Sequence, residues 1–184
     1  MKRIFLVFVL CLLLTGCGRS KADTGLQVRE QLQSSKGCSF RTVITADYTD
    51  VLYEFELDCS ADAMGNLTFE VIAPESIAGI SGFIKEEAGA ITFDDEVLAF
   101  DLMADDQITP ISAPWILVNT LRSGFLRGST DTDEGTVLLI DDSYEERAMR
   151  LQVWLNDENI PIASDIIWDG RRILSLIVSD FTYL

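Results

Sequence analysis

The chemistry open to this chain is limited by what it lacks, because none of its 184 residues is histidine. Ser-His-Asp and Cys-His catalysis, histidine metal ligation and histidine-based pH switching are therefore excluded. A serine nucleophile would need a lysine as its base, yet Lys21, Lys36 and Lys85 all lie outside any Ser-x-x-Lys sequence. The chain has no Gly-rich phosphate loop either. We predict that the protein is not an enzyme, with no catalytic residue and no cofactor.

Acidic residues are the other group that could do chemistry, and they recur in short clusters. The clusters are 94–96, 105–106, 131–134, 141–142 and 145–146. A glycosidase needs two carboxylates about 5–10 Å apart in a cleft, whereas these clusters fall where turns are expected. The stretch 131–135 resembles the start of a calcium loop but lacks the third oxygen-bearing residue before the glycine and the final glutamate. We predict solvated turns that protect strand edges, and no metal site.

The charge balance of the chain is strongly acidic. There are 14 Lys and Arg residues against 30 Asp and Glu residues, a formal charge of −16. Nucleic-acid phosphates need basic side chains to displace their counterions, so a nucleic-acid partner is excluded. The same sign of charge repels an anionic membrane surface. Attachment to a membrane must therefore come from something other than a basic patch.

The first residues have the pattern of a bacterial lipoprotein signal. A short basic start is followed by the apolar run 4–14, which as a helix would reach only about 16 Å, roughly half a bilayer core. This combination is typical of a secretory signal peptide. The ending Leu14-Thr15-Gly16-Cys17 resembles the lipobox, in which the cysteine becomes the lipid-modified first residue of the mature chain.

The predicted processing divides the chain into three parts. We expect a signal peptide over 1–16, a lipidated tether over 17–23 and a single domain over 24–184. Two or three acyl chains anchor a protein stably. Lipid on Cys17 would therefore hold the protein on the bacterial cell membrane, outside the cytoplasm.

Export would leave Cys38 and Cys59 as a pair in an oxidising compartment, where an isolated pair is most simply a disulfide. The two cysteines flank a predicted hairpin with the turn 47–50. An even loop centred on Tyr48 and Thr49 would place the cysteines opposite each other, within disulfide reach. We therefore expect a Cys38–Cys59 disulfide.

Hydrophobic periodicity predicts two helices and about eleven strands. The strands are expected at 40–46, 51–59, 67–73, 77–85, 90–94, 97–103, 125–130, 136–141, 147–156, 160–168 and 171–181. One helix is expected over 24–35. A second, over 113–123, is apolar on most sides, with Pro114 in its first turn and Gly124 after its end. A helix of this kind is normally buried, so both helices are expected to cover the dry face of the sheet.

The covered face allows two interpretations. It could be an ordinary core packed to crystal-like density. It could instead hold a lipid, with the helix 113–123 acting as a lid that moves to admit an acyl chain. The candidate cavity or lid residues are Tyr53, Phe55, Phe69, Trp115, Leu117 and Leu121.

Several phrases of the sequence resemble one superfamily over about residues 24–183. The phrases are 69–74 (FEVIAP), 77–80 (IAGI), 111–114 (ISAP), 151–156 (LQVWLN) and 173–181 (ILSLIVSDF). With the lipid cysteine, they resemble the LolA/LolB-like lipoprotein carriers, closest in style to GerS-like lipoproteins of spore-forming bacteria. The resemblance implies a mainly β fold with few helices (α+β), a curved half-open antiparallel barrel with its concave side covered by helices.

The resemblance implies two alternative functions. Carrier members hold acyl chains or lipid between sheet and helices. Germination-type members instead support a cell-envelope or spore cell-wall enzyme as anchored interaction modules. The chain differs from the soluble carriers in its own lipid anchor and in its cysteine pair. Its expected partners are therefore lipid or acyl chains, or an envelope protein, with the membrane reached through Cys17.

Replacement of Cys17 by alanine tests the predicted anchor, because it removes the atom that would carry the lipid. We expect the Cys17→Ala protein either to leave the membrane fraction or to accumulate unprocessed, as judged by cell fractionation and immunoblotting. A Cys11→Ala variant, altered inside the signal peptide, should behave like the unaltered protein. Membrane attachment and processing of Cys17→Ala that match the unaltered protein would contradict the lipoprotein prediction.

Overall fold

The structure is a computed structural model of the chain. It describes residues 22–48, 51–86, 88–94, 96–104, 107–133, 135–145 and 148–184. The predicted signal peptide over 1–16 and Cys17 lie outside the described residues.

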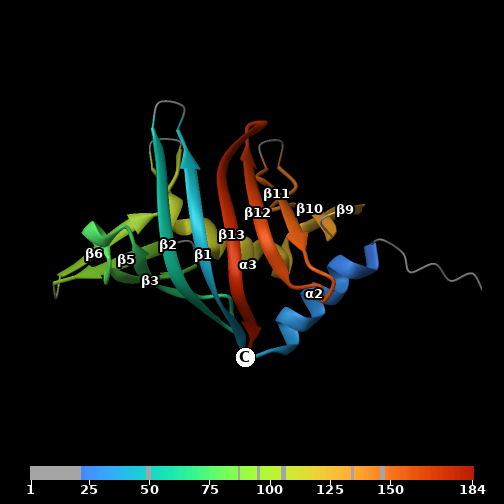
Figure 1. Ribbon diagram of the computed structural model, residues 1–184, viewed down its shortest axis with the longest axis horizontal. Coiled ribbons are helices and arrows are strands. Elements are labelled where there is room, and N and C mark those ends of the chain that lie inside the picture. The colour runs from blue at the N-terminus through green and yellow to red at the C-terminus, as the bar shows by residue number, and fades with distance from the viewer. Residues whose placement is uncertain are drawn as a thin grey trace, which may run out of the picture.

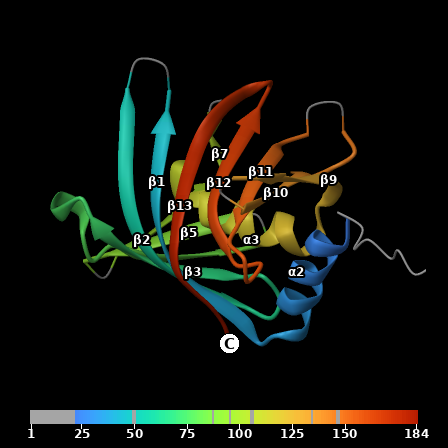
Figure 2. The same cartoon turned by 45° about the vertical axis from the view of Figure 1, so that its right-hand side comes forward.

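Eleven strands form one open antiparallel sheet (Figure 1). In chain order they are β1 (Gly37–Asp47), β2 (Leu52–Asp62), β3 (Leu67–Ala73), β4 (Ser81–Lys85), β5 (Ala88–Phe93), β6 (Glu96–Asp101), β9 (Phe125–Thr132), β10 (Gly135–Asp141), β11 (Arg150–Leu155), β12 (Pro161–Trp168) and β13 (Arg171–Tyr183). β7 (Met103–Ala104) and β8 (Gln107–Ile108) form a separate two-stranded sheet. The large sheet is strongly curved around helix α3 (Ala113–Ser123) and does not close (Figure 2). The predicted mainly β, half-open antiparallel fold is confirmed.

The first and last strands of the chain are neighbours in the middle of the sheet. β1 pairs antiparallel with β13, so that Val43 lies opposite Ile177. The strand order is β6-β5-β4-β3-β2-β1-β13-β12-β11-β10-β9. The sheet therefore consists of two meanders joined through β1 and β13. The segment that contains α3 passes from one outer edge to the other.

Both predicted helices are present. The first is α2 (Ala22–Ser34), and the second is α3, which follows a 3-10 turn over Pro110–Ser112. Pro114 lies in the first turn of α3, and the Gly124 N–H donates to the carbonyl of Thr120 at 2.8 Å, ending the helix. In the described part of the chain, no helix is long and apolar enough to cross a membrane.

The predicted strand 77–85 is shorter in the structure. Pro74 leads into a short 3-10 helix, Glu75–Ile77, and Gly79 takes a φ of +86°, a conformation that glycine adopts readily. Both features bend the backbone away from a strand. Only Ser81–Lys85 therefore forms β4.

The core lies between α3 and the concave face of the sheet. Along each central strand, side chains alternate between the two faces. Ile44 on β1, Leu57 on β2 and Leu174 on β13 have no exposed surface. They belong to one hydrophobic cluster with Leu117 and Leu121 of α3.

Two arginines tie α2 to the C-terminal end of α3. Arg29 on α2 donates to the carbonyl of Leu121 at 3.1 Å and to that of Gly124. Arg122 on α3 donates in return to the carbonyl of Leu32 on α2, at 3.0 Å. The last carbonyls of a helix lack intrahelical partners and carry partial negative charge, so a guanidinium group stabilises them. α3 is therefore held at its end as well as along its buried face.

The β1–β2 hairpin corrects the predicted cysteine register. Asp47 pairs with Leu52, so the loop is 48–51 and its centre lies one residue later than predicted. This moves the pairing by two residues: Cys38 lies opposite Ala61, and Cys59 lies opposite Phe40. Both cysteines are buried free thiols. The expected disulfide is absent from the structure, and the register argument for it is wrong.

Leu117→Ala tests the core between α3 and the sheet, because Leu117 has no exposed surface. We expect the variant to lose about 2–5 kcal/mol of unfolding free energy through lost burial and a cavity. Urea denaturation followed by circular dichroism measures this change. Leu98→Ala, at a β6 side chain that is 58% exposed, is the matched control and should cost less than about 0.5 kcal/mol. Equal losses would contradict the placement of α3.

Candidate functional site

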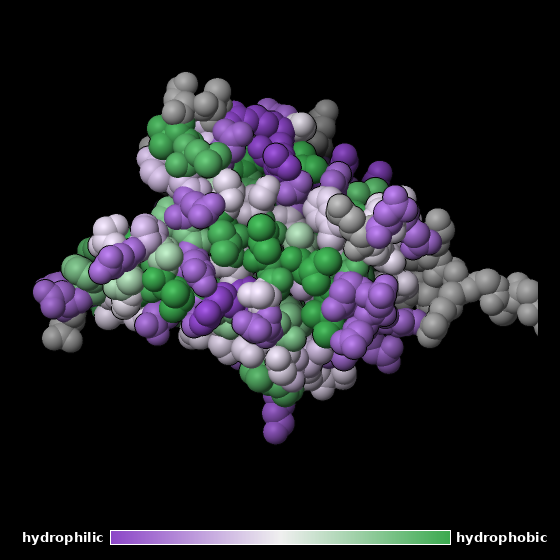
Figure 3. Space-filling view, in the orientation of Figure 1, coloured by the Kyte–Doolittle hydropathy of each residue, from purple (hydrophilic) through white to green (hydrophobic). Residues whose placement is uncertain are grey.

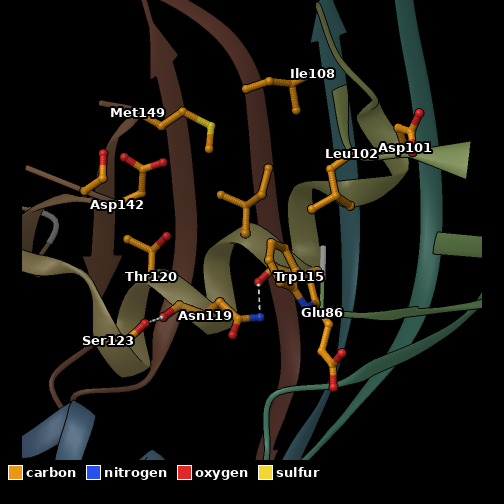
Figure 4. Close-up of a pocket in the computed structure, with 12 residues that line it drawn as sticks. Glu86, Asp101, Leu102, Ile108, Trp115, Asn119, Thr120, Ser123, Asp142 and Met149 are labelled. Carbon is orange, nitrogen blue, oxygen red and sulfur yellow. Dashed lines mark hydrogen bonds between the residues drawn. The ribbon is translucent and has the colours of Figure 1, made fainter. Parts of the chain in front are cut away.

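A cavity of about 650 Å³ opens beside α3. Its lining comes from α3, from 101–102 and Ile108, from Glu86 after β4, and from residues of the loop between β10 and β11. Figure 4 shows α3 along one side of the cavity, with Ile108 and Met149 across from it. The volume lies within the range of about 300–1,000 Å³ that is usual for small-ligand pockets.

α3 has two opposite faces, and only one of them lines the cavity. Successive residues of a helix are about 100° apart, so positions 115, 116, 119, 120 and 123 share one side. These positions line the cavity. Leu117, Val118 and Leu121 lie on the opposite side and are buried against the sheet. α3 therefore forms one wall of the cavity with this face, while its other face packs against the sheet. The predicted movement of α3 as a lid stays a prediction.

Apolar side chains form the innermost part of the cavity. Ile108 and Ile116 line it while being almost completely buried, and Leu102, Trp115 and Met149 are partly buried around them. Each CH₂ group of a hydrocarbon chain moved from water into such surroundings gains about 0.8 kcal/mol. The cavity can therefore stabilise a hydrocarbon chain.

Two polar side chains of α3 in the cavity are already hydrogen-bonded within the protein. The Asn119 amide donates to the carbonyls of Trp115 and Gly65, each at 3.2 Å. The Ser123 hydroxyl donates to the carbonyl of Asn119 at 2.9 Å (Figure 4). These donors need no partner from a ligand, so this part of the wall is compatible with an apolar guest.

Asp141 and Asp142 are adjacent but have opposite environments. Asp141 on β10 accepts a hydrogen bond from Arg150 at 3.1 Å and lies 3.6 Å from Arg127. Asp142 lines the cavity, and its Oδ1 atom is buried with no hydrogen-bond partner among the described residues. Burial raises the pKa of the Asp142 carboxyl, against the opposing effect of hydrogen bonds from nearby groups. Asp142 is thus a carboxyl group without a compensating cation in the described part of the chain.

Of the six predicted cavity or lid residues, Trp115 is the one that lines this cavity. Leu117 and Leu121 are buried in the core beneath α3, and Phe69 on β3 is buried as well. The remaining two aromatic residues lie on β2, where Tyr53 is 47% exposed and stacks on Phe55 with ring centroids 6.2 Å apart. The prediction placed the cavity between α3 and the sheet. In the structure, that face of α3 is packed against the sheet, and the cavity lies on the opposite face.

The sequence interpretation missed most of the cavity lining. Ile116 and Thr120 could have been found from helical spacing, since they share a side with Trp115. Ile108 and Met149 could not. No local pattern indicates that the short strand β8 and the loop after β10 lie beside α3.

The convex face of the sheet has a more open hollow of about 340 Å³. It is lined by Trp154, Ile162 and Ile177, together with the ion pair of Arg172 and Asp165 at 3.3 Å. Figure 3 shows hydrophobic residues across the middle of this face. The hollow is a surface depression, in contrast to the cavity beside α3.

The two thiols lie in surroundings that make them poor nucleophiles. Burial raises the pKa of Cys38 to about 11, and it also raises the pKa of Cys59. The thiolate is the reactive and metal-binding form of cysteine. Within the described ranges, no group of cysteine and acidic side chains is placed to hold a metal ion.

Comparisons with known proteins give structural likeness alone. No protein-family model matches the chain, and no curated protein matches it. A LolA superfamily protein from Nitrosomonas europaea is 10% identical with a TM-score of 0.45, covering 87% of this chain and 93% of that one. A conserved protein from Thermus thermophilus is 14% identical with a TM-score of 0.48, covering 88% of each chain. The Mycobacterium tuberculosis lipoprotein LppX is 12% identical with a TM-score of 0.42, covering 85% and 92%.

Thiol labelling tests the state of Cys38 and Cys59. In the chain from residue 18 onward, we expect Ellman's reagent without reductant to label both thiols in urea, and to react far more slowly with the native protein because both are buried. A Thr92→Cys variant controls for the activity of the reagent. Its added cysteine lies at an exposed position of β5, so one thiol of the native variant should react fast. Two thiols unreactive even in urea would mean that they are joined, and would contradict the structure.

Proposed function

We propose that the protein is a lipid-anchored extracytoplasmic lipoprotein that binds an acyl chain or lipid in the cavity beside α3. The observation that carries this proposal is the 650 Å³ cavity with Ile108 and Ile116 in its innermost part. α3 presents this wall from a fixed position, because its other face is packed on the sheet and Arg29 holds its end. The site is therefore preformed and needs little reorganisation to accept a chain.

The sequence supports the location and the class of ligand. The motif ending at Cys17 would place the cavity outside the cytoplasm, on a tether of a few residues. The pattern over 24–183 resembles the LolA/LolB-like carriers, for which an acyl chain is the expected guest. Lipid on Cys17 would keep the protein at a membrane surface, where such guests are abundant.

A second candidate function is an anchored interaction module for an envelope protein, such as a cell-wall enzyme in the GerS-like manner. The observation that favours it is the exposed apolar surface of β6, which is an edge strand of the sheet. Val97 and Leu98 are neighbours on β6 and point to opposite faces, yet they are 63% and 58% exposed. An exposed apolar edge strand can accept a strand from another protein.

Binding of an uncharged single-chain lipid tests the proposed function. All residues of the described core lie from Val28 onward, so the chain from residue 18 contains the complete core. We expect monolauroylglycerol to bind one-to-one and to change the fluorescence of Trp115 in a Trp154→Phe/Trp168→Phe background, since Trp115 lines the cavity. Native mass spectrometry of the purified protein should also retain a copurified lipid.

A cavity-filling variant and its matched control locate the binding. Ser123→Phe adds bulk in the cavity and should weaken binding at least tenfold. Ser60→Phe makes the same change at an exposed position of β2 and should bind like the parent. Equal binding by both variants would move the site elsewhere. Absence of both binding and copurified lipid would favour the interaction module.

A further inference from the structure

The charged side chains that line the cavity are all carboxylates in the described part of the chain. They are Glu86, Asp101 and Asp142, and the lining includes no lysine or arginine. In Figure 4, Asp142 lies at one end of the cavity and Asp101 and Glu86 lie at the other. The three groups therefore border an apolar site from different elements instead of forming one acidic loop.

The described basic side chains near the cavity are directed elsewhere. Arg127 and Arg150 both approach Asp141, at 3.6 and 3.1 Å, and not its neighbour Asp142. Lys85 lies 4.0 Å from Glu86, and both side chains are largely exposed. An exposed pair of this kind contributes little. The cavity thus retains its negative character.

Two further features would favour a positive group inside the cavity. The Asp142 Oδ1 atom is buried and lacks a hydrogen-bond partner among the described residues, so a bound ammonium group would supply the missing donor. Trp115 presents an aromatic ring in the same cavity. A cation over the face of an indole ring gains about 0.5–2 kcal/mol, more as it is desolvated. An anionic head group would instead meet three carboxylates and no described cation.

We propose that the cavity selects single-chain amphiphiles with a positively charged, amine-type head group. The chain would lie against Ile108 and Ile116, and the head would lie at one of the two acidic ends, beside Asp142 or beside Asp101 and Trp115. This inference rests on the proposed function, to which it adds the head-group class. It predicts that fatty-acid carboxylates and phosphate-headed anionic lipids are poor ligands. A purely apolar binding site would not distinguish among these head groups.

The test compares three amphiphiles that share a 12-carbon chain, each below its micelle concentration. They are dodecylammonium, uncharged monolauroylglycerol and dodecanoate, titrated into the chain from residue 18 and followed by Trp115 fluorescence and calorimetry. We expect dodecylammonium to bind about tenfold more tightly than monolauroylglycerol, as two weak interactions of the head group at one acidic end would give. Dodecanoate should bind most weakly.

Two double variants with the same change in net charge separate the cavity from the overall acidity of the protein. Asp101→Asn/Asp142→Asn should reduce the preference for the ammonium head to threefold or less while monolauroylglycerol still binds. Glu54→Gln/Glu70→Gln, at exposed positions on the convex side of β2 and β3, should preserve the preference.

The outcomes separate this inference from the proposed function. Equal binding of the three head groups, or tightest binding of dodecanoate, would overturn the head-group inference and leave chain binding in place. An equal loss of preference in both double variants would also overturn it, because the selection would then come from overall charge. No binding of any amphiphile would overturn the proposed function itself.

Discussion

The packing of one face of α3 against the curved sheet is the contact on which the rest of the site depends. Leu117, Val118 and Leu121 are buried there, and burial of such side chains contributes about 1.5–3 kcal/mol each. Because this face is fixed, the opposite face must point into the opening of the half-barrel. Arg29 and Arg122 fix the end of the helix through backbone carbonyls. The cavity is thus a consequence of a well-packed core and needs no loosely packed region of its own.

The two faces of α3 have different roles, one in stability and one in lining the cavity, and the sequence alone does not distinguish them. Stability comes from the dry contact with the sheet, and the cavity wall comes from Trp115, Ile116 and Thr120. The charges follow a similar division. Asp141 is neutralised by arginines, while Asp142, the next residue, is left facing the cavity. Recognition of a positive head group would therefore draw on charges that the described fold does not use for its own stability.

Local sequence patterns predict most of the elements but not their assembly. The strand 67–73 and the helix 113–123 have the predicted limits, because alternation, Pro114 and Gly124 act within a few residues. The pairing of β1 with β13 joins residues more than a hundred positions apart, and no local pattern encodes it. The cysteine register failed for a related reason. A one-residue error in the centre of the loop 48–51 moves every pair of the hairpin by two residues.

The cavity was the least predictable part, because its lining is brought together by the chain's return from β6 to β9. The sequence instead predicted a cavity lined by aromatic residues of β2 and β3. In the folded sheet, these residues lie in the core or at the end of the β1–β2 hairpin.

Photo-crosslinking with an uncharged fatty alcohol that carries a diazirine at the end of its chain tests the central claim most directly. Mass spectrometry should find the label on Ile108, Ile116, Met149 or their immediate neighbours. Labelling confined to the convex face around Trp154 and Ile177, or to β6, would contradict an acyl-chain site beside α3.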